Sequence, residues 1–185
     1  MKNQLRIIGG QWKRRQLPFA NIEGLRPTPD RVRETLFNWL MWEIQNADIL
    51  DLCTGSGALS FEALSRGAKS VVMIEPDRTQ IGYLKQNLER LQVSSQFAKL
   101  KNTTAQQAIS QLKQQYDLVF LDPPYSLNLW SELANQVDPF IKNEGLIYVE
   151  ADQNLAQLAL PSTWNLIKET KAGTVQAGLF KKLNK

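Results

Sequence analysis

Residues 118–125 consist of four apolar residues followed by Asp-Pro-Pro-Tyr. This order of residue types could support chemistry on a planar base. Four apolar residues followed by turn formers predict a buried strand that stops abruptly. Each proline fixes its own φ and lacks an N–H, and Pro124 also biases Pro123 towards extended geometry. Asp122 and the Pro123 carbonyl could therefore accept two N–H bonds from an exocyclic amino group, while Tyr125 stacks on the ring. The alternative is an ordinary strand end with a Pro-Pro turn, because short motifs also arise by chance.

A second candidate site lies at the first predicted strand-to-helix turn, over residues 51–58. Gly55 and Gly57 would let the backbone approach a ligand closely. Glu75 ends the next predicted strand, where an acid can bind the two hydroxyls of a ribose. A dinucleotide-binding motif would need a third glycine where Ser60 stands, so a dehydrogenase is disfavoured. The spacing also suits the other nucleoside cofactor held on such a sheet, S-adenosylmethionine.

The composition restricts the chemistry further. The chain has 185 residues, which is enough for one domain with a full core. It has no histidine, which removes His general bases, Ser-His and Cys-His nucleophile pairs and His-ligated metal sites. The single Cys53 excludes an internal disulfide and fits a reducing compartment. Since there is also no membrane-length apolar run and no signal-peptide stretch, we expect a cytoplasmic protein that binds neither membrane nor metal.

The net charge of +4 is unevenly distributed along the chain. Residues 1–46 hold 8 Lys or Arg against 4 Asp or Glu, whereas residues 47–185 hold 14 of each. The basic N-terminal part is therefore a candidate contact surface for a polyanion, and a solvated basic arm is the alternative.

From position 49 onward, predicted strands alternate with predicted helices, which favours a parallel sheet with helices on both faces. The expected strands are 49–53, 70–74, 97–100, 118–121 and 145–149, and the expected helices are 58–66, 77–91, 105–115 and 129–140. Residues 164–170 and 174–181 predict a final antiparallel pair.

The residues ahead of this core predict two elements. Residues 5–17 predict a hairpin whose tight turn is formed by two consecutive glycines. Thr28 predicts the N-cap of a helix and Pro29 its first residue. Arg31 and Arg33 would project from the first turns of this helix, where they either pair with neighbouring acids or contact a ligand.

Together these motifs resemble the class I S-adenosylmethionine-dependent methyltransferases, and more closely the RsmD family of bacterial 16S rRNA guanine-N2 methyltransferases. The most specific matching segments are 6–13, 24–28, 30–40, 55–59, 62–66 and 122–125. The resemblance implies a Rossmann-like α/β fold, with a seven-stranded, mostly parallel sheet whose last strand is antiparallel, preceded by an N-terminal β-hairpin arm. It divides the chain into a basic, RNA-facing extension over 1–46 and a methyltransferase core over 47–185.

The resemblance also implies an activity: direct in-line methyl transfer from S-adenosylmethionine to the exocyclic N2 of a specific guanine in 16S rRNA. We expect the rRNA to be met within a small-subunit assembly particle, and the protein to act as a monomer. Asp-Pro-Pro-Tyr also occurs in adenine-N6 DNA methyltransferases, but an added target-recognition domain is lacking here. A non-catalytic RNA-binding or ribosome-assembly protein is a further alternative, against which the intact acid and glycine positions argue.

The resemblance assigns roles residue by residue. The predicted catalytic residues, which hold the target base, are Asp122, Pro123, Pro124 and Tyr125. The predicted cofactor-binding residues are Thr28, Arg31, Asp51, Cys53, Gly55, Gly57, Glu75, Pro76, Thr104, Ala105 and Asp122. The predicted RNA-binding residues are Arg6, Trp12, Lys13, Arg14, Arg15, Arg26 and Arg33. Trp12 either stacks on an unpaired base or packs the hairpin onto the core.

Two of these positions depart from the family pattern. Cys53 stands where the common methyltransferase pattern has glycine, so the approach of the backbone to the cofactor differs there. Thr104 stands where the adenine-binding loop usually has Asp or Asn. We therefore expect adenine to be contacted by the backbone at Thr104 and Ala105 rather than by the threonine side chain.

Overall fold

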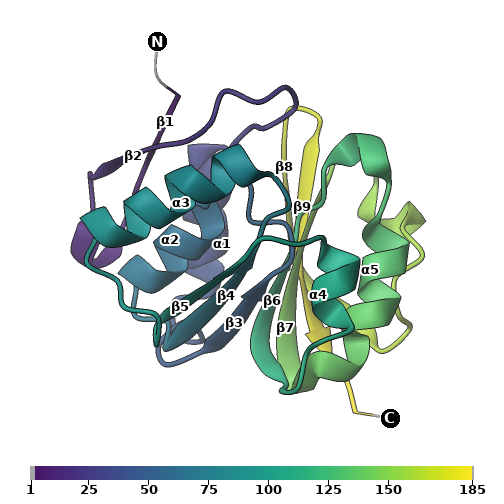
Figure 1. Cartoon of the computed structure of the whole chain (residues 1–185). Helices are drawn as coiled ribbons and strands as arrows, with labels where there is room; N and C mark the ends of the chain where they lie inside the picture. Colours follow the sequence, from purple (N-terminus) through teal and green to yellow (C-terminus); the bar gives the residue numbers. More distant parts are fainter. Residues whose placement is uncertain (1–2, 185) are drawn as a thin grey trace.

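The structure of the protein is a computed structural model that describes residues 3–184. Within these residues, seven strands form one sheet in the order β5-β4-β3-β6-β7-β9-β8 (Figure 1). The strands are β3 (Asp48–Asp51), β4 (Ser70–Ile74), β5 (Ala98–Lys101), β6 (Tyr116–Leu121), β7 (Ile141–Ala151), β8 (Trp164–Ala172) and β9 (Val175–Lys182). Strands β3 to β7 are parallel, and β9 runs antiparallel between β7 and β8. The predicted sheet is confirmed.

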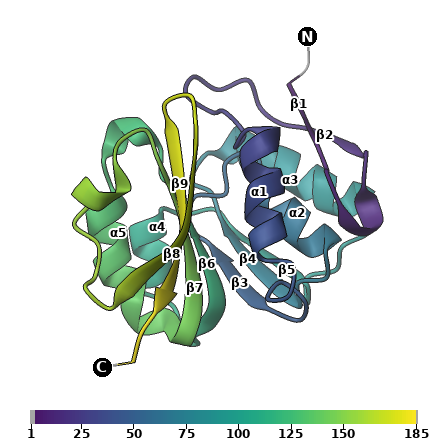
Figure 2. The ribbon, with the colours of Figure 1, turned by 180° about the vertical axis from the view of Figure 1, so that it is seen from behind.

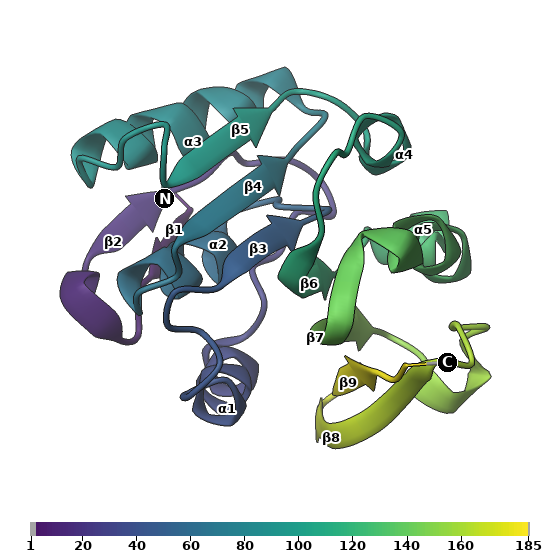
Figure 3. The same cartoon turned by 90° about the horizontal axis from the view of Figure 1, so that it is seen from below.

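Helices cover both faces of this sheet (Figure 3). The helices α1 (Asp30–Trp39), α2 (Ala58–Ser65) and α3 (Arg78–Arg90) lie on one side, and α4 (Ala105–Ile109) and α5 (Trp130–Val137) on the other. Alternate residues of β6 face the two helix layers. Phe120 packs on the side of α1, α2 and α3, and Val119 packs on the side of α4 and α5. A strand that is buried on both faces is apolar throughout rather than alternating, which explains the continuous run that ends β6.

The carboxyl ends of β3, β4 and β6 meet at one edge of the sheet. In the parallel register, Asp51 of β3 lies opposite both Met73 of β4 and Phe120 of β6. The residues that follow these strands therefore emerge side by side. The chain order also reverses between β3 and β6, and ligands of open α/β sheets bind at such a switch point.

The N-terminal hairpin consists of β1 (Gln4–Arg6) and β2 (Gln16–Pro18), which pair antiparallel (Figure 2). The predicted tight Gly-Gly turn is wrong, because Gly9 is extended and a 3₁₀ helix over Gly10–Trp12 lies in the connection. Gly10 has φ 75°, and a Cβ atom there would overlap the carbonyl oxygen of Ser65. The connection is therefore shaped by its close approach to the end of α2.

Buried apolar residues join the hairpin to the rest of the protein. Leu5, Ile7 and Leu17 belong to the same hydrophobic cluster as Leu36 of α1 and Phe61 of α2. The extension over 1–46 thus packs as part of the layer that covers the sheet. Its separate role in facing RNA stays a prediction, and Lys2 lies outside the described residues.

The predictions for the ends of three helices were wrong. Helix α4 ends at Ile109 instead of 115, where the Ser110 hydroxyl turns back to the carbonyl oxygen of Gln107 at 2.8 Å. Helix α5 ends at Val137 instead of 140, because Pro139 has no N–H to continue it. Helix α1 begins at Asp30 with no side-chain cap. Pro29 occupies the N-cap position, so Thr28 is not the N-cap and Pro29 is not the first helical residue. Among residues 3–184, no helix combines the length and the apolarity needed to span a membrane.

Candidate active site

Asp51, at the end of β3, is a carboxylate enclosed by the protein. Its side chain is 2% exposed, and the Ser60 hydroxyl donates to its Oδ2 at 2.5 Å. Burial, reinforced by the nearby charge of Glu75, raises the pKa of Asp51 to about 7 against hydrogen bonds that lower it. The Asp51 side chain is therefore easily neutralised, and a positive charge placed beside it would favour the ionised form.

The glycine turn behind Asp51 needs its glycines. Gly55 and Gly57 have φ values of 52° and 85°, which lie in the left-handed region. A Cβ atom on Gly57 would also overlap the ring of Phe61. The turn is fixed from both sides, since Gly55 N–H donates to Glu75 and the Gln80 amide donates to the Gly55 carbonyl at 2.7 Å.

Glu75 follows β4 directly and is 8% exposed. It accepts the N–H of Gly55 at 3.0 Å and the N–H of Asp77 at 2.8 Å, one on each carboxylate oxygen. Each oxygen has a further lone pair, so the carboxylate can still accept the hydroxyls of a ribose. Burial raises its pKa more than these two bonds lower it.

Sequence reasoning missed Asn102, which connects two of the predicted cofactor loops. Its amide donates to the carbonyl oxygens of Glu75 at 3.1 Å and of Pro76 at 2.8 Å. The loop after β4 is thereby tied to the loop after β5. A polar residue directly after a strand was the available signal.

The side chain of Thr104 makes local hydrogen bonds at the start of α4. Its hydroxyl accepts the N–H of Gln107 at 3.3 Å and caps α4, completing a capping box. This agrees with the expectation that the threonine side chain does not hold adenine, and contact through the backbone at Thr104 and the buried Ala105 stays a prediction. Arg31 is exposed on α1, and its place in the cofactor set also stays a prediction.

Cys53 is the residue on which the charges of three acids of this edge act together. Its side chain is half-buried, and the pKa of its thiol is raised well above the usual value by burial and then by the charges of Asp51, Asp122 and Glu75. Three acids whose charges act on one small side chain make the local potential negative when they are ionised. This set of groups fits a ligand that carries a positive centre and hydroxyl groups, as S-adenosylmethionine does.

Asp122 begins the predicted base-binding corner at the end of β6. Its carboxyl is half-buried, and the hydroxyl of Thr28 lies 3.5 Å from its Oδ2. Burial raises the pKa of Asp122 well above its usual range, and the charges of Glu150 and Asp51 raise it further. Thr28 was predicted both to cap α1 and to bind the cofactor, and it lies beside Asp122, the predicted base-binding acid.

Tyr125 is held by a buried acid that sequence reasoning did not identify. Its hydroxyl donates to Oε1 of Glu150 at 3.0 Å, and its ring lies 5.9 Å from that of Trp130, centroid to centroid. Glu150 is 3% exposed and also accepts the Tyr148 hydroxyl on Oε2 at 2.7 Å. An acid at the carboxyl end of the predicted strand 145–149 was the signal that could have been used.

The predicted RNA-binding residues divide into two groups. Lys13, Arg14, Arg15 and Arg26 are exposed, while Trp12 is half-buried and packs against the core, which supports the packing alternative. The remaining two, Arg6 and Arg33, take part in the contacts that hold the hairpin in place.

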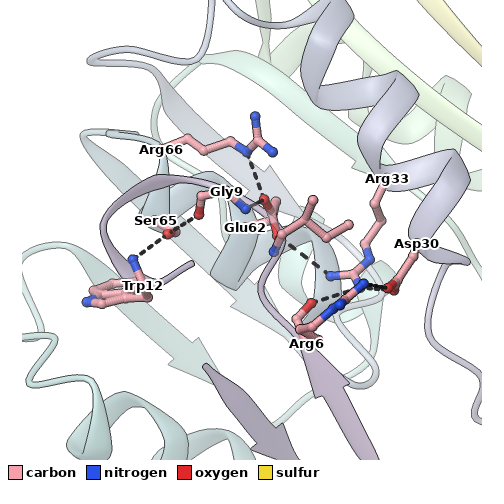
Figure 4. Close-up of polar contacts among 9 residues, drawn as sticks. Arg6, Gly9, Trp12, Asp30, Arg33, Glu62, Ser65 and Arg66 are labelled. Carbon is pink, nitrogen blue, oxygen red and sulfur yellow. Dashed lines mark hydrogen bonds and ion pairs between the residues drawn. The ribbon is translucent and has the colours of Figure 1, made fainter. Parts of the chain in front are cut away.

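Arg33 is not available to RNA. It is 1% exposed, and its guanidinium donates to the Arg6 carbonyl at 2.9 Å and pairs with Asp30 at 2.5 Å (Figure 4). Because such a side chain cannot reach a phosphate, Arg33 leaves the predicted set. Arg6 also pairs with Asp30, at 3.0 Å, but stays largely exposed.

An open, mostly parallel sheet, with acids beyond three adjacent strands and a glycine turn after the first, defines the class of Rossmann-like methyltransferases. A family model described as "Conserved hypothetical protein 95" matches residues 5–181. The chain belongs to this family, which is the RsmD family that its motifs resemble.

Relatives and solved structures agree with this assignment. The chain is 44% identical to "Ribosomal RNA small subunit methyltransferase D" of Haemophilus influenzae, with 97% of this chain and 94% of the relative covered. It is 42% identical to the protein of the same name in Escherichia coli, over 97% of this chain and 90% of the relative. The solved yhhF protein of Escherichia coli superimposes with a TM-score of 0.90 at 41% identity, covering 99% of this chain and 100% of that one.

Proposed function

We propose that this protein transfers a methyl group from S-adenosylmethionine to the exocyclic N2 of a guanine in 16S rRNA. The observation that carries the proposal is the position of Asp122-Pro123-Pro124-Tyr125, at the carboxyl end of β6 and beside the acids around Cys53. The names of the relatives support small-subunit rRNA as the substrate. We also propose that the protein acts as a monomer, in the cytoplasm, on a small subunit that is still being assembled.

The cofactor half of the site would be built from the three converging acids. S-adenosylmethionine, when bound, supplies the methyl group on a positively charged sulfur that leaves as a neutral sulfide. Glu75 would accept the ribose hydroxyls, as an acid after the second strand of such a sheet does. Asp51 and the backbone of Gly55 and Gly57 would shape the methionine end, where the negative potential favours a cation.

The base half would hold the nucleophile. The amino nitrogen of guanine is a poor nucleophile because its lone pair is conjugated with the ring. Asp122 and the Pro123 carbonyl would accept its two N–H bonds, fix its direction and stabilise the positive charge that develops on it. The base must leave its stack to reach this corner, and stacking on Tyr125 would offset part of that cost.

The test is methyl incorporation into small-subunit rRNA, free and assembled, and into DNA, followed by mass spectrometry of the nucleosides. We expect N2-methylguanosine from rRNA. N6-methyladenine from DNA would instead identify an adenine-N6 DNA methyltransferase, and cofactor binding without any methylation would identify a non-catalytic RNA-binding protein.

Two variants separate the halves of the site. Asp122→Ala should lower turnover a few hundredfold, because losing one charge-stabilising acceptor costs about 3 kcal/mol in the barrier. Cofactor affinity should change far less, because Asp51 and Glu75 remain. Glu75→Ala should show the opposite pattern and weaken cofactor binding by roughly 1.5 to 3 kcal/mol, with RNA affinity retained. Near-normal turnover of Asp122→Ala would remove the proposed catalytic role.

A further inference from the structure

Glu150 lies behind the base-binding corner, on the strand beside it. In the parallel register of β6 and β7, Leu121 pairs with Val149, so the next residues along the two strands are Asp122 and Glu150. A carboxylate that is 3% exposed is costly unless it is hydrogen-bonded. The two phenols that donate to Glu150 come from the corner itself, at Tyr125, and from β7, at Tyr148.

One hydroxyl stands between the two acids. The Thr28 hydroxyl donates to Oδ2 of Asp122 at 3.5 Å, and Thr28 also helps to hold down the pKa of Glu150. A threonine hydroxyl has a single proton, so it can donate to only one carboxylate at a time. Thr28 is 4% exposed and reaches this place from the loop before α1. Thr28 therefore links the environments of the two acids.

We propose that Glu150 is a positioning residue for the methyl transfer, which fixes the Tyr125 ring at the base site through its hydroxyl and keeps Asp122 a strong proton acceptor through its own charge. The inference rests on the proposed function and deepens it. As N2 forms its bond to the methyl carbon, the carbon–sulfur bond would break with its electron pair left on sulfur. One N–H bond of the amino group must also break. Its proton passes to a carboxylate oxygen of Asp122, where an O–H bond forms, and then to solvent.

The charges around Asp122 support this role. The groups that face it are Glu150 and Tyr148 from β7, Asp51 from β3, Cys53 from the turn after β3, and Tyr125 and Thr28. Its pKa is raised first by burial, then by the charge of Glu150 and then by that of Asp51. Hydrogen bonds from Tyr148, Tyr125 and Thr28 favour the ionised form of Glu150 against its own burial. Removing the charge of Glu150 should therefore lower the pKa of Asp122.

The test is Glu150→Gln, which keeps the shape of the side chain and removes its charge. We expect kcat on small-subunit rRNA to fall about tenfold or more, because Asp122 becomes a weaker proton acceptor and Tyr125 is held less firmly. The acidic limb of the pH–rate profile should move to lower pH by at least about half a unit. The Kd for S-adenosylmethionine should stay near the parent value.

Tyr125→Phe and Tyr148→Phe form a matched pair. Each removes one hydroxyl donor from Glu150, but only the first loosens a ring at the corner. Tyr125→Phe should raise the KM for rRNA severalfold, whereas Tyr148→Phe should leave it near the parent value.

An acidic limb that does not move in Glu150→Gln overturns the proposal, even if kcat falls along with thermal stability, since that combination is a structural effect. If Glu150→Gln does not fold, Tyr125→Phe decides, and a KM equal to that of Tyr148→Phe overturns the positioning role. Methylation of rRNA by the parent protein tests the proposed function separately, because the variants are compared within an active parent.

Discussion

At the scale of single residues, the negative charge of Asp51 is proposed to favour cofactor binding but lowers the stability of the folded protein. Its carboxyl is buried beside Glu75, so the folded protein holds a proton there up to a pH of about 7. In the unfolded chain the same group loses its proton near pH 4. Between these values the folded state binds more protons than the unfolded state, and the free energy of unfolding falls as the pH rises. The charge that is proposed to favour a cationic ligand thus destabilises the protein when no ligand is bound.

The variant Asp51→Asn tests this opposition. Because asparagine does not titrate, the free energy of unfolding of the variant relative to that of the parent should rise by on the order of 2 kcal/mol from pH 5 to pH 8. Urea unfolding of the two cofactor-free proteins at both pH values measures it. The same variant should bind S-adenosylmethionine more weakly. A relative stability that does not change with pH would show that Asp51 is already ionised at pH 5.

The sequence identified the acids that follow apolar strands, and it missed those whose partners are distant. Asp51 and Asp122 had to emerge at the carboxyl edge once their strands were parallel. Glu150 looks like an exposed strand end until the pairing of β6 and β7 places Tyr125 over it. Thr28 has the local signature of an N-cap, but its hydroxyl instead contacts the carboxylate of Asp122, which is far along the chain. A local sequence pattern cannot predict that a contact with a residue distant in the sequence will replace a local one.

At the scale of elements, Glu62 of α2 is the clamp that holds the hairpin. Its carboxylate is fully buried and accepts the N–H of Ile8 at 2.9 Å, the N–H of Gly9 at 2.7 Å and Nε of Arg66 at 2.8 Å (Figure 4). Arg33 of α1 adds an ion pair at 3.7 Å. One buried acid therefore joins the hairpin, α1 and α2.

Replacing Glu62 with glutamine should release the hairpin. The N–H groups of Ile8 and Gly9 bond to different oxygens of Glu62, and in glutamine one of these positions becomes an NH2 group that can only donate. One backbone N–H therefore loses its acceptor, which costs about 1–3 kcal/mol. We expect a lower melting temperature and faster tryptic cleavage at the basic residues 13–15. Glu89→Gln, the same change at an exposed position of α3, is the matched control and should behave as the parent. Equal protease resistance in Glu62→Gln would show that the apolar contacts of the hairpin suffice.

Element boundaries were predictable where local and tertiary preferences agree. Strand β4, Ser70–Ile74, was predicted to the residue, since its last four residues are apolar and turn formers lie near both ends. Strand β7 begins four residues earlier than predicted, because Ile141 pairs with Tyr116 and the polar residues 142–144 are carried into the strand at a register shift. Pairing with a neighbouring strand overrode weak β-propensity there.

At the scale of the whole molecule, the predicted base-binding corner and the basic turn lie at opposite ends of α2. The helix begins after Gly57, at the carboxyl edge of the sheet, and ends at Ser65, whose hydroxyl accepts the N–H of Trp12 at 3.0 Å. Eight residues of helix span roughly 12 Å. An RNA that places a base at Asp122 could therefore have its backbone held at the turn, and the clamp at Glu62 would keep that spacing constant.

Neutralising Lys13, Arg14 and Arg15 together, as glutamines, tests this arrangement. These exposed residues should contact phosphates, so RNA binding should weaken, and the slope of log K against log salt should flatten by roughly 0.7 to 0.9 for each phosphate that is no longer neutralised. Titrations at several salt concentrations measure it. The matched control removes the same charge at Lys99, Lys101 and Lys113, which line a groove on the α4 side of the sheet. Both variants remove three positive charges. A steeper salt slope for the control than for the first variant therefore locates the RNA at the hairpin, and equal slopes mean that the basic turn is simply solvated.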